Sequence, residues 1–159
     1  MRQIAAYGVA VEVPTAWECR ILRRTAAPSE QTHAVVHLAN FPLPEQRDDF
    51  GGGVTPAMRA ADVFVVLFEY GPESLGKPLF KAQGVPKLAP EMFSPRRLQR
   101  PLPGQLGCQL FFTANGRPFC LYVVMGGRAA LPALTAQANA GLQGLAIHAP
   151  EVQPLPSRP

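Results

Sequence analysis

Apolar and polar residues alternate with the period of β-strands along much of this chain. Residues 9–13 alternate and stop at Pro14. Residues 17–24 alternate again after the turn, so we expect these two runs to pair as a hairpin or short meander. A third alternating run covers residues 33–39. Together the runs predict a mainly antiparallel sheet.

Residues 62–70 form a run that is apolar on both faces. A strand of this kind has to be covered on each side, so it belongs in the middle of a sheet. The sequence therefore predicts a central strand with material packed over both faces.

The clearest local pattern lies around Asn115-Gly116, a pair that favours the tight type I′ turn of a hairpin. Counting outward from this turn places Phe112 opposite Phe119. Leu110 then lies opposite Leu121, on a face that is wholly apolar and therefore core. The opposite face is mixed, and it carries Phe111, Cys120 and Tyr122.

A helix is predicted after Gly126-Gly127, with Pro132 in its first turn. Apolar residues recur there at helical spacing and form the stripe that should cover the sheet: Leu131, Leu134, Ala138, Leu142 and Leu145. With 159 residues the chain is typical of one domain. We expect a single α+β domain over residues 1–148 and a flexible, proline-rich tail over residues 149–159.

Composition places the chain among globular proteins, with 47% hydrophobic and 16% charged residues. No apolar run approaches the roughly 18 residues of a membrane span, so no membrane insertion is expected. The first residues lack the pattern of a signal peptide, which indicates a cytoplasmic protein. Its three cysteines lie in apolar strand-like runs and are interpreted as structural thiols of a reducing compartment.

Positive charge is concentrated in residues 77–100, named here the basic segment. It holds six basic residues against the single acid Glu91, a net charge of +5, while the rest of the chain sums to about −1. Its prolines exclude a regular helix or a central strand, so we expect an irregular surface segment. The six basic residues are the candidate partner-binding residues: Lys77, Lys81, Lys87, Arg96, Arg97 and Arg100.

Phe80, Met92 and Phe93 are interleaved with these cations, a mixture used by protein interfaces and by single-stranded nucleic-acid sites. An ordinary solvated loop is the alternative interpretation. Among partners we favour an acidic protein surface over nucleic acid, because proteins that bind nucleic acid carry a basic excess beyond one loop.

No catalytic, metal-binding or cofactor-binding motif is found. His33 and His37 share the spacing of a helical metal pair, but in a strand they lie about 13 Å apart and cannot hold one ion. We therefore expect two histidines on an exposed face. The glycines 51–53 indicate a flexible loop, and the acids beside them a solvated turn: Glu45, Asp48 and Asp49.

Residues 8–17, GVAVEVPTAW, resemble the start of the PsbP-like fold superfamily, in which a strand ends in a Pro-x-x-Trp turn. The resemblance implies an α/β/α sandwich around an antiparallel sheet. Members include a photosystem extrinsic subunit, a Ran-binding nuclear import factor and bacterial DcrB-type proteins. The resemblance implies protein binding without catalysis, but no binding residue of the family can be carried over to this chain.

The leading hypothesis is therefore a non-catalytic protein-binding or accessory module, such as a subunit or chaperone of a larger assembly. The alternative is a small-molecule-binding protein or enzyme. Its pocket would lie between the glycine loop and the mixed face of the hairpin, at Phe111, Cys120 and Tyr122.

Overall fold

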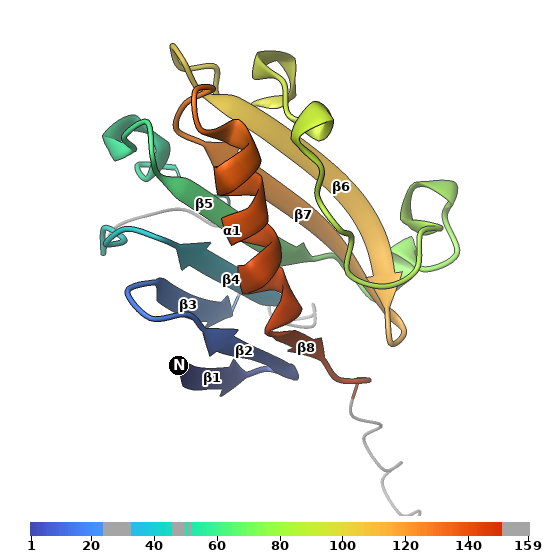
Figure 1. Ribbon diagram of the computed structural model, residues 1–159. Coiled ribbons are helices and arrows are strands. Elements are labelled where there is room, and N and C mark those ends of the chain that lie inside the picture. The colour runs from blue at the N-terminus through green and yellow to red at the C-terminus, as the bar shows by residue number, and fades with distance from the viewer. Residues whose placement is uncertain (24–32, 46–49, 51, 151–159) are drawn as a thin grey trace, which may run out of the picture.

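The computed structural model describes residues 1–23, 33–45, 50 and 52–150, and its strands form two antiparallel sheets (Figure 1). The smaller sheet has the order β1 (Arg2–Ala6), β2 (Val9–Val13), β8 (Leu145–Ile147). The larger has the order β3 (Glu18–Arg23), β4 (Ala34–Ala39), β5 (Val63–Glu69), β7 (Arg117–Met125), β6 (Leu106–Ala114). Helix α1 (Leu131–Gln143) lies across one face of the larger sheet. The α+β class and the antiparallel pairing are as predicted, but the strands divide between two sheets, whereas the sequence predicted one.

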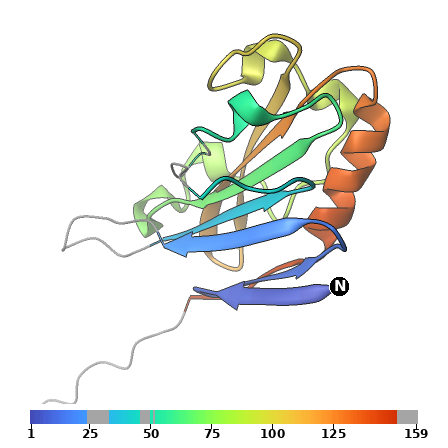
Figure 2. The same ribbon diagram turned by 90° about the vertical axis from the view of Figure 1, so that its left-hand side faces the viewer.

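The predicted pairing of the first two alternating runs is wrong. β2 pairs with β1 and β8, whereas β3 pairs with β4. At the Pro14 turn the Trp17 amide donates to the Pro14 carbonyl and Ala16 adopts a φ of 69°, and the chain passes from one sheet to the other. Figure 2 shows β1 and β2 beside the larger sheet rather than continuous with it. The alternation identified the strands, but their partners depend on contacts far away in sequence.

The hairpin and the central strand are confirmed. β6 and β7 pair with Phe112 opposite Phe119 and Leu110 opposite Leu121, the register counted from the Asn-Gly turn. β5 lies in the middle of the five-stranded sheet, and all seven of its residues are buried.

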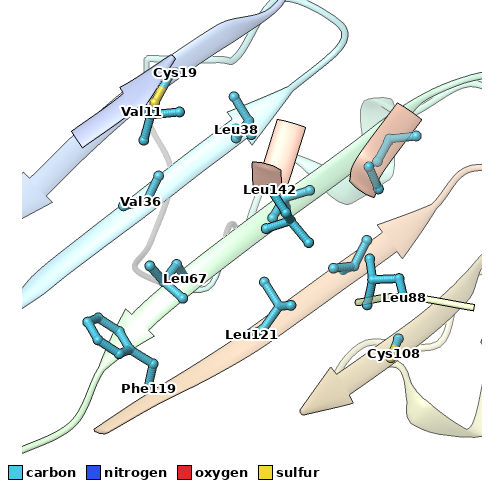
Figure 3. Packing of buried hydrophobic residues seen from close by; sticks show 14 of the residues in the cluster. Val11, Cys19, Val36, Leu38, Leu67, Leu88, Cys108, Phe119, Leu121 and Leu142 are labelled. Atoms are coloured by element: carbon cyan, nitrogen blue, oxygen red, sulfur yellow. The ribbon is translucent and has the colours of Figure 1, made fainter. Parts of the chain in front are cut away.

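Two hydrophobic clusters cover the two faces of the larger sheet. The first lies between the sheet, α1 and β2, and includes Val11, Leu67, Leu121 and Leu142 (Figure 3). The second lies on the opposite face beneath residues 41–45, 50 and 52–58, where Leu43 and Val54 are buried.

His37 belongs to this second face, and the prediction that it is exposed is wrong. Its side chain is completely buried, with its ring centroid 5.4 Å from that of Phe64. This region looks like a solvated loop in composition, yet its described residues, 41–45, 50 and 52–58, cover this face of the sheet. His33 lies at the start of the same run and is half-buried.

Short 3-10 turns shape the connections among the described residues, and each has a proline in its first two positions. Proline fixes φ near the helical value and lacks the amide that the first turn leaves unpaired. These turns are η1 (Thr55–Ala57), η2 (Pro72–Ser74), η3 (Pro78–Phe80), η4 (Pro90–Met92) and η5 (Pro95–Arg97).

A buried ion pair between β5 and β7 of the larger sheet is also hydrogen-bonded to the smaller sheet. Arg117 Nε lies 2.6 Å from Glu69 Oε2, and both side chains are at most 10% exposed. The same guanidinium donates to the carbonyls of Tyr7, Gly8 and His148, which belong to the ends of the smaller sheet. No helix among the described residues is long and apolar enough to cross a membrane.

Candidate functional site

The basic segment runs along β6, at the edge of the larger sheet. Backbone hydrogen bonds join it to that strand at two places: Thr113 bonds with Ala82 and Gly84 at 2.8 Å, and Ser94 exchanges two bonds of 3.0 Å with Gly107. The segment therefore satisfies part of the open edge of β6, which would otherwise offer unpaired backbone groups to another chain.

Buried side chains hold the segment against the sheet. Leu88 and Phe93 insert into the first cluster, and Leu98 inserts into the second. The side-chain amide of Asn139 in α1 binds both backbone groups of Leu88. Its Oδ1 accepts from the Leu88 amide at 2.8 Å, and its Nδ2 donates to the Leu88 carbonyl at 2.9 Å. The segment is irregular in secondary structure but firmly packed.

The aromatic residues of the basic segment face inward. Phe80 is 4% exposed and Phe93 is 8% exposed, while Met92 is half-buried. The interleaving seen in the sequence therefore does not give a mixed aromatic and cationic surface. Stacking platforms for nucleic-acid bases need exposed rings, and these two rings are part of the core.

The six candidate cations are all exposed, and none forms an ion pair with a described residue. The structure does not bring them together. Lys77 and Lys81 flank η3 near the Thr113 end of β6, and Lys87 adjoins Leu88 beside α1. The three arginines lie together in the chain around η5, at the Gly107 end of β6, and are named here the arginine end.

Local hydrogen bonds fix the backbone of the arginine end. Ser94 caps η5, since its Oγ accepts from the Arg96 amide at 3.2 Å. The Arg97 guanidinium donates to the Met92 carbonyl at 3.2 Å. The side chains of Arg96 and Arg100 make no hydrogen bond with a described residue, so both are free to meet a partner.

An apolar groove of about 750 Å³ lies beside the arginine end. Its walls come from segments far apart in sequence: Ala60, the stretch from Pro95 to Leu106, and the turn after β7. That turn needs glycine, because a Cβ on Gly126 would overlap the carbonyl of Arg59. Of all the residues lining the groove, only Gln105 and Arg128 have polar side chains.

Gln105 is the feature that sequence reasoning missed. Its side chain is buried at 5% exposure, and its Nε2 donates to the Thr55 carbonyl at 2.7 Å. Its Oε1 is buried and has no hydrogen-bond partner among the described residues. The proline-rich sequence around Gln105 gave no indication that this amide would be enclosed.

The described residues do not assemble a group of three or more potential metal ligands. All three cysteines are buried and free. Burial raises the pKa of the Cys19 and Cys120 thiols to about 11, and it raises the pKa of Cys108 against the lowering effect of the nearby Arg97. Thiols in this state are poor nucleophiles at neutral pH.

The mixed face of the hairpin is largely closed. Cys120 is fully buried and Tyr122 is 3% exposed, with the Tyr122 hydroxyl accepting from the Gln99 amide at 2.9 Å. Phe111 is half-buried and meets Phe80 edge-on. The groove described above does not include these three side chains. Gly51, Asp48, Asp49 and most of the predicted tail lie outside the described residues.

No protein-family model, curated protein or solved structure matches this chain significantly.

Proposed function

We propose that this protein is a non-catalytic binding or accessory module that recognises an acidic surface of another protein through its basic segment. One observation carries the proposal: the arginine end presents exposed cations on a backbone that is fixed against the sheet. A surface that is already ordered loses less conformational entropy when a partner binds, so more of the interaction energy remains as affinity.

Charge complementarity at such a surface acts mainly on association rate and partner choice. Exposed ion pairs contribute about 0.2–1 kcal/mol each, so the arginines alone do not make a tight complex. The partner should therefore also bury apolar surface beside them. The arginine end adjoins an apolar groove that offers this surface.

The PsbP-like fold and its α/β/α sandwich remain part of the proposal. Their support is the Pro14 turn followed by the buried Trp17, the late hairpin, and the terminal helix leading into β8. An α/β/α sandwich has two helical layers. Because α1 is the one α-helix among the described residues, it corresponds to one of these layers, and no described helix corresponds to the other.

The test compares two charge reversals of equal size. Arg96→Glu/Arg100→Glu changes the arginine end, and Arg20→Glu/Arg23→Glu makes the same change in net charge on β3, at the other edge of the larger sheet. Each tagged variant is used to capture proteins from an extract of the native cell after nuclease treatment. A partner bound by the wild type and the β3 variant, but lost with the arginine variant, supports the proposal.

Two results would contradict it. Capture unaffected by the arginine reversal removes the basic segment from the function. Capture that disappears after nuclease treatment, with the wild-type protein, shows that nucleic acid rather than an acidic protein occupies the segment. Purified partner and variants should then show binding that weakens as salt is raised, because exposed charges are screened.

A further inference from the structure

We propose that the apolar groove beside the arginine end binds a small amphipathic anion of the N-acyl amino acid type, whose amide N–H donates to Gln105 Oε1. The acyl chain would lie against the prolines and leucines of the walls, and the carboxylate would face Arg128. This inference adds a small ligand to the groove that the proposed protein partner would also use, and its tests are carried out without that partner.

Size and lining favour a small, largely apolar ligand. Pockets for small molecules occupy roughly 300–1,000 Å³ and combine apolar walls with a few placed polar groups. The groove, at about 750 Å³, falls within this range, and its walls include Pro95, Pro101, Leu98 and Leu102. Because the walls have few polar groups, those groups determine which ligand is recognised.

Gln105 requires the ligand to donate a hydrogen bond. Its Nε2 is already committed to the Thr55 carbonyl, and this bond also fixes which end of the amide is oxygen. A buried amide oxygen without a partner costs free energy that a ligand donor can recover. Oε1 exposes almost no surface, so ligand binding requires the Gln105 side chain to turn toward the groove.

Arg128 determines the sign of the ligand's charge. It is exposed, it lines the groove on the turn between β7 and α1, and it forms no ion pair with a described residue. The acidic residue Asp62 is hydrogen-bonded to this turn. Its backbone carbonyl accepts from the Gly126 amide, and its carboxylate accepts from the Arg59 amide. A carboxylate on the ligand therefore finds a cation at the mouth of the groove.

The sharpest test uses two compounds that differ in one hydrogen-bond donor. N-octanoylglycine has an amide N–H, whereas N-octanoylsarcosine carries a methyl group in its place and keeps the same chain and carboxylate. Binding of each to the purified wild-type protein is measured by isothermal titration calorimetry. We expect the glycine compound to bind about tenfold more tightly, which corresponds to about 1.4 kcal/mol.

Variants assign this preference to residues. Gln105→Met removes the acceptor while keeping the length of the side chain, and should reduce the ratio between the compounds to about one. Arg128→Gln should weaken the binding of both compounds several-fold and by the same factor. Amide shifts in the NMR spectrum of the wild-type protein should change at Leu102, at residues 104–106 and at residues 126–129, a result that needs no variant to fold.

Equal binding of the two compounds to the wild-type protein would overturn the inference. So would shift changes confined to another part of the molecule. A wild-type preference that persists in a folded Gln105→Met protein would exclude Gln105 as the acceptor. Loss of compound binding together with normal partner capture leaves the proposed function intact, because the two experiments use different ligands.

Discussion

Replacing Arg117 with methionine should destabilise the protein by about 3–5 kcal/mol, the usual cost of removing one partner of a buried ion pair. The guanidinium binds Glu69 through two bonds of 2.6 and 2.8 Å and donates to three backbone carbonyls at 3.0–3.2 Å. In the methionine variant the Glu69 carboxylate keeps one donor, the Ala34 amide at 3.2 Å. Most of the expected cost comes from this remaining buried charge.

The charge explanation can be separated from simple loss of packing by a double variant. Glu69→Gln/Arg117→Met removes both charges, and glutamine can still accept from the Ala34 amide. We expect this protein to be more stable than Arg117→Met alone, so that the two substitutions are strongly non-additive. Arg20→Met, an exposed position on β3, serves as the control and should change stability by less than about 0.5 kcal/mol.

Urea unfolding followed by circular dichroism gives these free energies. Hydrogen exchange should also rise at β1 and β2, because Arg117 contacts the carbonyls of Tyr7 and Gly8 at their connecting turn. The reasoning is refuted if Arg117→Met is as stable as Arg20→Met. It is also refuted if the two substitutions are additive, since the buried carboxylate would then not be the source of the cost.

Three further outcomes follow from the structure. Burial raises the pKa of Cys19 and Cys120 to about 11, while the thiols of the unfolded chain ionise near 9. The free energy of unfolding should therefore fall as pH rises from about 9 to 11. Urea midpoints across this range measure the fall, with Cys19→Ala/Cys120→Ala as the control. Gly144→Ala should cost about 1–3 kcal/mol, because its Cβ would lie 2.6 Å from a backbone oxygen of β2; thermal unfolding that matches wild type would contradict this. Asn139→Ala should speed hydrogen exchange around Leu88 by releasing the basic segment from α1, and unchanged protection would show that the buried anchors suffice.

The features predicted well from sequence are those fixed by neighbours along the chain. The register of β6 and β7 follows from one tight turn and the alternation on each side of it, so Phe112 and Phe119 could be placed opposite each other in advance. The position of β5 followed because both of its faces are apolar, a pattern that only a central strand satisfies.

The features that were missed depend on segments that meet only in the folded chain. His37 was expected on an exposed face because its own strand does not reveal that residues 41–45, 50 and 52–58 cover that face. The pairing of β2 with β8 could not be identified, because β8 lies more than 130 residues later and nothing in the sequence favours it over a strand that is nearby in the chain. The groove is assembled from three separate stretches, and the buried Gln105 side chain bonds to Thr55, which is 50 residues away in sequence.

The way the basic segment protects the edge of the sheet also explains why its cations face solvent. A segment that hydrogen-bonds to the edge strand and inserts Leu88, Phe93 and Leu98 into the core has these three apolar residues committed to one side. Its charged residues then have only the outer side available, because burying an unpaired cation is prohibitively costly. Edge protection and a cationic surface are thus two results of the same packing. Loosening the anchors should therefore weaken partner binding even when every cation is retained.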